Sequence, residues 1–174
     1  MLRYIDHTKM GRGIHGWLDS HFHFSFAEYY NPQNIQFGVL RVVNDDMVQP
    51  GTGFDTHPHQ NMEILSYVVQ GELTHADNMG NEQTLTRGQV QYMSAGTGVL
   101  HSEYNMGKDL LRFLQIWILP DASGYQPNYG DYRLSLIHIC NPHRRPRGRK
   151  PQHMDQVRYG LGRAELSQHE ARDG

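Results

Sequence analysis

The sequence predicts an all-β protein in which short strands form a double-sheet jelly roll or a barrel. Apolar and β-branched runs recur along the chain, and glycine-containing turns separate them at hairpin-like intervals. No long segment has the 3.6-residue period of an amphipathic helix. The 174 residues are enough for one domain of ordinary size with a substantial hydrophobic core.

Four runs are the clearest candidate strands because each is apolar or β-branched and ends at turn residues. They cover residues 36–43, 63–69, 88–93 and 111–119. The turn signals around them are Gly51-Thr52-Gly53, Gly80-Asn81, Gly96-Thr97-Gly98 and Gly130. Asp45 and Asp46, just after the first run, are expected in a turn between strands.

An aromatic segment precedes the first of these runs. Its large side chains are expected to pack in the core and over the end of the barrel rather than to form a stacking platform; they are Trp17, Phe24, Phe26, Tyr29 and Tyr30. His21 and His23 form a His-x-His pair inside this segment, which is interpreted as structural packing.

Two doublets of metal-ligating residues, His57-x-His59 and His101-x-Glu103, form the candidate site. Residues i and i+2 of a strand point to the same face and lie about 7 Å apart. If the two strands are neighbours, three imidazoles and one carboxylate converge on one metal ion and leave coordination positions open for chemistry. With 12 histidines in the chain, an ordinary surface or core pair is the alternative for each doublet.

Pro58 limits where the first doublet can lie. Proline lacks the N–H that a central strand donates, so this stretch should be a strand start, an edge or a bulge. A bulge would be compatible with ligands that point inward. The alternative is that residues 56–59 form a plain loop.

The surroundings of both doublets resemble the two halves of the cupin signature, in which a glycine turn precedes a His-x-His strand and a second strand returns a further histidine. The matching positions are Gly51, His57, His59, Glu63 and Gly71, then Gly88, Ser94-Ala95-Gly96, His101 and Asn105. The glycine after Glu63 is one residue late, and Ser94 stands where cupins usually have proline.

A longer series of motifs resembles one cupin branch, the N-terminal domain of a bacterial pirin, from about residue 2 to residue 133. The series comprises residues 15–20 (HGWLDS), 24–26 (FSF), 30–32 (YNP), 40–46 (LRVVNDD), 53–59 (GFDTHPH), 62–64 (MEI), 77–81 (DNMGN) and 93–105 (MSAGTGVLHSEYN). This resemblance implies a cupin-type double-stranded β-helix, which is a jelly-roll barrel. It also implies that the metal ligands are His57, His59, His101 and Glu103, with Glu103 in the role that a generic cupin gives to Glu63.

The resemblance further implies a function, quercetin 2,3-dioxygenase activity, in which O2 cleaves a flavonol ring and carbon monoxide is released. One divalent transition metal is expected; the resemblance favours Fe²⁺, while three imidazoles and a carboxylate also suit Ni, Cu, Mn or Zn. Glu103 is the expected catalytic residue, taking the proton of the flavonol 3-hydroxyl. Two alternatives stay open, a metal-dependent redox-sensing protein that binds a partner protein, and a truncated, inactive relic.

The charge balance of the sequence changes from acidic to basic near residue 134. Residues 135–174 contain 8 Lys or Arg against 4 Asp or Glu, whereas residues 1–134 contain 8 against 14. The basic, proline-rich run 142–151 cannot bury enough apolar surface to fold alone, so disorder is expected for 134–174. Because pirins continue into a second cupin-like barrel, the segment is interpreted as an aberrant or truncated second domain, or alternatively as a basic arm for nucleic acid or an acidic partner.

Composition excludes several classes of protein. The sequence contains no signal peptide pattern and no apolar run long enough to span a membrane, and its lone Cys140 suits a reducing compartment, so a cytoplasmic protein without membrane contact is expected. The net charge of −2 gives no reason to expect nucleic-acid binding by the whole chain.

Overall fold

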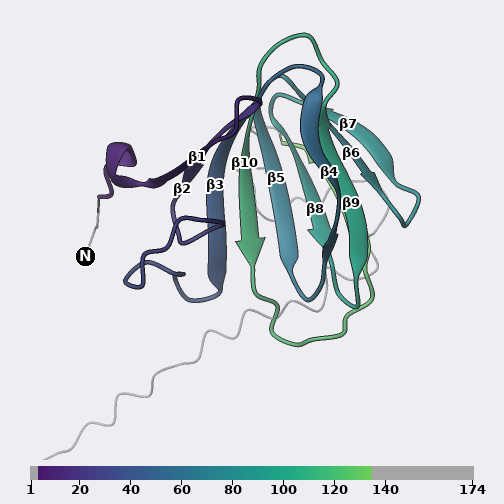
Figure 1. The fold of residues 1–174 in the computed structure, drawn as a ribbon. Coiled ribbons are helices and arrows are strands. Elements are labelled where there is room, and N and C mark those ends of the chain that lie inside the picture. The colour runs from purple at the N-terminus through teal and green to yellow at the C-terminus, as the bar shows by residue number, and fades with distance from the viewer. Residues whose placement is uncertain (1–3, 135–174) are drawn as a thin grey trace, which may run out of the picture. The chain divides into compact units, whose positions relative to one another are not determined.

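Eleven strands and one short 3₁₀ helix make up residues 4–134, the part of the chain that the computed structural model describes (Figure 1). In chain order they are η1 (His7–Lys9), β1 (Gly11–Ile14), β2 (Leu18–Phe22), β3 (Leu40–Val48), β4 (Thr52–His59), β5 (Glu63–Gln70), β6 (Glu72–Asp77), β7 (Glu82–Thr86), β8 (Gln89–Ser94), β9 (Val99–Asn105), β10 (Leu111–Ile118) and β11 (Asn128–Arg133). The tail expected to be disordered lies outside the described residues, apart from Leu134.

The strands form two antiparallel sheets. One has seven strands in the order β1-β2-β3-β10-β5-β8-β11, and the other has four in the order β4-β9-β6-β7. Figure 1 shows β3, β10 and β5 side by side in the first sheet, with β4 and β9 paired beside them. This arrangement confirms the predicted all-β, double-sheet fold.

Three predicted strands are confirmed almost to the residue, as β5, β8 and β10. The prediction for the first run was wrong in extent, because β3 starts at Leu40 and continues to Val48. The predicted turn at Asp45 and Asp46 was therefore also wrong. Both aspartates lie inside β3, where they pair with β2 and β10.

The two aspartates are accommodated because each has a partner on its own face of the sheet. Asp46 points inward, is 3% exposed, and accepts a hydrogen bond from the Ser20 hydroxyl on β2. Asp45 points outward and forms an ion pair with Arg112 on β10 at 2.6 Å. Satisfied polar groups are tolerated in a strand that turn propensity alone would end.

Two apolar clusters occupy the interior between the sheets. The larger contains Leu18, Val48, Val68, Leu73, Leu85, Leu111 and Phe113. The smaller contains Ile64, Met93 and Val99.

A row of buried polar residues lies at inward-facing positions of the seven-stranded sheet, and we call it the polar band. Its members are Asn44, Gln115, Ser66 and Gln91, which are successive register partners on β3, β10, β5 and β8. On β5, Ser66 stands between Ile64 of the smaller cluster and Val68 of the larger one. Buried amides and hydroxyls require hydrogen-bond partners, so the members of the polar band must find polar partners inside the core.

The N-terminal aromatic segment packs largely as predicted. Phe24 is buried, and Trp17 packs edge-on against Phe54 with ring centroids 5.2 Å apart. The prediction was wrong for Tyr30, whose side chain is 72% exposed.

Candidate metal centre

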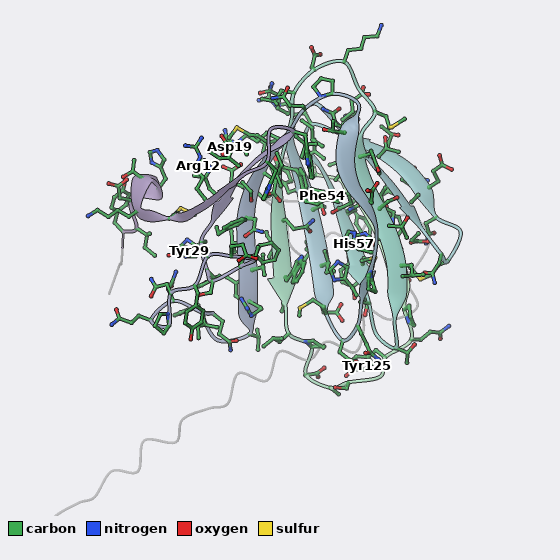
Figure 2. All side chains as sticks on the ribbon, in the orientation of Figure 1. Arg12, Asp19, Tyr29, Phe54, His57 and Tyr125 are labelled. Atoms are coloured by element: carbon green, nitrogen blue, oxygen red, sulfur yellow. The ribbon has the colours of Figure 1, made fainter. Side chains whose placement is uncertain are left out.

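The two ligand doublets lie on neighbouring strands. The first is at the end of β4 and the second is on β9, and these strands pair antiparallel with His57 opposite His101 and His59 opposite Val99. Figure 2 shows Phe54 and His57 along the same strand, β4. The alternative that residues 56–59 form a plain loop is wrong, because β4 extends to His59.

A β-bulge in β4 decides which way the histidines point. Phe54 opposes Glu103 and His57 opposes His101, so β4 uses one residue more than β9 between these pairs. With regular pairing from Phe54 onward, His57 would oppose Leu100, which is 44% exposed. The bulge therefore reverses the alternation of β4 and brings His57 and His59 onto the same face as His101.

Pro58 is tolerated because β4 is the edge strand of the four-stranded sheet. An edge location was one of the predicted possibilities. The bulge lies N-terminal to the proline, between Phe54 and His57, rather than at the proline itself.

The rings of His57, His59 and His101 form a compact triangle. Their centroids are 4.5–4.9 Å apart, and one ring nitrogen from each lies within 4.8 Å of the other two. The Nε2 atom of His101 is buried and has no hydrogen-bond partner among the described residues. A buried ring nitrogen without a hydrogen-bond partner, beside two further imidazoles, fits a transition metal ion.

Burial and neighbouring imidazoles lower the pKa of two histidines of the triangle, His59 and His101. Burial, with the neighbouring His57 and His75, lowers the pKa of His101 to about 3. Burial, with His101 and His57, lowers the pKa of His59 to about 4. Neutral imidazole is the form that binds a metal. At neutral pH these two side chains are therefore in the protonation state that metal binding requires.

Glu103 lies beside the triangle and connects the two sheets. Its Oε1 accepts hydrogen bonds from Ser66 at 2.7 Å and Gln91 at 2.6 Å, and its Oε2 accepts one from Gln115 at 2.7 Å. All three donors belong to the polar band. A carboxylate oxygen of Glu103 lies within 4.8 Å of ring nitrogens of His101 and His75, rather than of all three histidines of the triangle.

His75 is a site residue that the sequence reasoning missed. It lies on β6, opposite Glu103 on β9, and is fully buried. Its Nδ1 is 3.5 Å from Nδ1 of His101, and its Nε2 is 3.1 Å from Oδ2 of Asp77. Its ring stacks on Tyr129 at 4.4 Å. The available signal was His75-x-Asp77, an i, i+2 spacing like that of the two doublets.

Three further residues lie outside the histidine triangle. Gln115 on β10 is buried and faces the interior. Glu63 starts β5 and accepts hydrogen bonds from Tyr92 and from Ser94 at 2.8 Å. In the described part of the chain His21 joins no group of metal-ligating side chains.

Aromatic side chains flank His59. The Trp117 ring lies 4.8 Å from the His59 ring at an interplanar angle of 80°, and Phe26 packs on Trp117 from another direction at 5.4 Å. The Trp117 Nε1–H is buried and has no acceptor among residues 4–134. The site thus combines an apolar wall with an unused hydrogen-bond donor.

A search of residues 4–134 for membrane-spanning segments finds no helix with the required length and apolar character.

Comparison with protein families identifies one match, the Pirin model, over residues 5–118. A quercetin 2,3-dioxygenase of Escherichia coli K12 is 44% identical over 169 residues, which cover 94% of this chain and 73% of that protein. A pirin-like protein of Caulobacter vibrioides is 51% identical over 122 residues, covering 70% of this chain and 53% of the relative. The chain spans about half the length of most curated relatives it matches.

Two solved structures extend the comparison. The crystal structure of YhhW from Escherichia coli superposes with a TM-score of 0.74 at 47% identity, over 76% of this chain and 57% of that one. A nickel(II) complex of the same bacterial pirin gives a TM-score of 0.72 at 48% identity, over 74% and 56%. The described fold is the cupin-type jelly-roll barrel that the sequence predicted.

Proposed function

The chain belongs to the pirin family, and from this membership we propose that it is a metal-dependent dioxygenase that cleaves quercetin-like flavonols with O2 and releases carbon monoxide. The observation that carries the proposal is the triangle of His57, His59 and His101, with the buried, unpartnered Nε2 of His101. Fe²⁺ is the proposed ion, and Ni, Cu, Mn or Zn suit the same nitrogen and oxygen donors.

The proposed ligands are the three histidines of the triangle and Glu103. When bound, the ion supplies a Lewis acid that lowers the pKa of the flavonol 3-hydroxyl and a redox-active centre for the reaction with O2. Glu103 would complete this ligand set, and the Gln91 and Gln115 amides donate hydrogen bonds that orient its carboxylate.

Glu103 is also the proposed acceptor of the proton from the flavonol 3-hydroxyl. The Ser66 hydroxyl donates to its Oε1 at 2.7 Å, but the same Oγ lies 3.2 Å from Oε1 of Gln115. A hydroxyl has one hydrogen, so its rotation toward Gln115 frees a lone pair on Glu103. The Gln91 and Gln115 amides can hold the carboxylate in place during this exchange.

The aromatic wall beside His59 suits a planar, partly polar substrate. Trp117 and Phe26 offer apolar surface for the rings of a flavonol, and the Trp117 Nε1–H can donate to one of its oxygen atoms. The contact of the Trp117 ring with His59 also shields part of this side of the triangle from water.

Turnover of the Fe²⁺-loaded full chain tests the proposal. Loading is done without O2, quercetin and O2 are then added, and O2 uptake, loss of flavonol absorbance and release of carbon monoxide are measured. Turnover is expected in the wild type and its loss in a His57→Ala/His101→Ala variant. One bound ion per chain without O2 uptake would contradict the dioxygenase and favour a metal-dependent regulatory protein. Equal metal content in both proteins would contradict the metal site itself.

A further inference from the structure

A chain of three buried side chains leads away from the triangle, through residues that the proposed reaction does not use. His101 on β9 contacts His75 on β6, and His75 contacts Asp77 two residues further along β6. We propose that His75 and Asp77 are a positioning pair that holds His101 in the one tautomer able to bind a metal. The inference rests on the proposed metal site, but not on the proposed substrate or reaction.

Strand register brings the three side chains together. Asp77 is the direct cross-strand partner of His101, and His75 is the partner of Glu103. The two Nδ1 atoms of the histidines are 3.5 Å apart, and His75 Nε2 is 3.1 Å from Asp77 Oδ2. The His75 and Asp77 side chains are fully shielded from solvent. Water therefore cannot replace either contact without a change in the fold.

The direction of each hydrogen bond follows from the chemistry at the Asp77 end. An ionised carboxylate only accepts, so the His75 proton lies on Nε2 and its Nδ1 carries a lone pair. That lone pair accepts a hydrogen bond only if His101 carries its proton on Nδ1. A neutral imidazole has one ring proton, so Nε2 of His101 is then unprotonated, which explains its lack of a partner.

The turn between β6 and β7 fixes Asp77 for this role. Its Oδ1 accepts hydrogen bonds from the backbone N–H groups of Met79 at 2.9 Å and Asn81 at 3.0 Å. The Asn81 side-chain amide contacts both carboxylate oxygens, and Gly80 has the positive φ of 89° that the tight turn requires. The motif Asp77-Asn78-Met79-Gly80-Asn81 thus leaves Oδ2 directed toward His75.

His75 is itself held against rotation. Its ring stacks on Tyr129 at 4.4 Å with an interplanar angle of 12°. The Tyr129 hydroxyl lies 3.2 Å from Oε1 of Gln91, whose amide donates to Glu103. The positioning pair and the support of Glu103 are therefore parts of one packed unit.

Asp77→Asn is the sharpest test because it is nearly isosteric and reverses the donor and acceptor of both hydrogen bonds, from residue 77 to His75 and from His75 to His101. The two backbone N–H groups require an oxygen at the Oδ1 position, so the new amide nitrogen faces His75. His75 then accepts at Nε2 and donates from Nδ1, which forces the His101 proton onto Nε2. We expect Ni²⁺ affinity to fall about 10–100-fold, the usual effect of losing such a partner of a metal ligand.

The experiment uses the full chain without metal and has two readouts. Long-range ¹H–¹⁵N spectra report which nitrogen of each histidine carries the proton, and Ni²⁺ titration reports affinity and stoichiometry. The wild type should show His101 protonated at Nδ1 and His75 at Nε2, with both reversed in Asp77→Asn. Asp45→Asn, at an exposed ion pair, is the matched control and should change neither readout.

Three results would overturn the positioning role. They are a His101 proton on Nε2 in the wild type, an unchanged Ni²⁺ affinity in a folded Asp77→Asn protein, and a second Ni²⁺ ion that binds at His75 and is lost in the variant. If the Asp77→Asn protein does not fold, the position of the His101 ring proton in the wild-type protein is the deciding measurement. None of these readouts involves a flavonol or O2, so they are independent of the proposed reaction.

Discussion

His57 and His101 lie directly opposite each other on β4 and β9 because a bulge between Phe54 and His57 accommodates the one extra residue of β4. The i, i+2 spacing explains why two histidines of one strand share a face. It does not determine which face that is. The bulge sets the face, and with it the whole geometry of the histidine triangle.

Deletion of Thr56 should remove the bulge and keep the triangle. Phe54 and His57 would then be two residues apart, like Glu103 and His101, so regular pairing leaves both side chains on the inner face and Ni²⁺ affinity, measured by calorimetry, should be retained. Deletion of both Asp55 and Thr56 makes Phe54 and His57 adjacent, so either the histidines turn outward or Phe54 leaves the core, and affinity should fall beyond detection. Equal affinity of the two deletion variants would contradict the role of the bulge.

Gly53→Ala should destabilise the β4–β9 ladder next to the bulge. A Cβ at this position would lie 2.3 Å from the Glu103 carbonyl oxygen and 2.6 Å from the Tyr104 Cα, which are both backbone atoms. Overpacking of this kind costs about 1–3 kcal/mol, measured as the free energy of unfolding in denaturant. Gly130→Ala is the control, because its Cβ would meet only the end of the Tyr132 side chain, at 3.2 Å. Equal stability of the two variants would count against this steric account.

Gln115→Glu should destabilise the polar band. The Gln115 amide donates to Glu103 at 2.7 Å, and the replacement puts a second carboxylate at this distance in a buried site. Two like charges there cannot both ionise without a loss of about 3–5 kcal/mol in the free energy of unfolding at pH 8. Lower pH should relieve the loss because one carboxylate takes up a proton. Gln70→Glu, at an exposed position of β5, serves as the control.

Asp46→Asn should stabilise the protein in a pH-dependent way. Burial, with the nearby Glu103 and Asp45 and against the Ser20 hydrogen bond, raises the pKa of Asp46 from 3.8 to about 7. The folded state thus binds a proton that the unfolded state releases between pH 4 and 7, so wild-type stability falls across this window.

The variant lacks this titration, so its advantage over the wild type should grow from near zero at pH 4 to about 2–4 kcal/mol at pH 8. Urea unfolding at both pH values measures the difference. Asp45→Asn should change stability by less than about 1 kcal/mol at either pH, since its ion pair with Arg112 is on the surface. A constant difference between Asp46→Asn and wild type would contradict the raised pKa.

Several parts of the fold could be predicted from local sequence. Residues 63–69, 88–93 and 111–119 are runs rich in apolar and β-branched residues between turns, and each forms a strand. The prediction ended the first strand too early because Asp45 and Asp46 have strong turn propensity. Their partners, Arg112 and Ser20, come from other strands. Local propensity carries no information about such partners.

The sequence by itself determined the all-β class, the family, and the four candidate ligands, because residue type and i, i+2 spacing are local properties. Only the tertiary structure decided that a bulge turns His57 inward, that the polar band surrounds Glu103, and that His75 and Asp77 stand behind His101. These features depend on register between strands distant in the chain, and register is set by packing of the whole sandwich. The spacing of His75-x-Asp77 resembles that of the doublets, but spacing within one strand does not show that His75 contacts His101 on another strand.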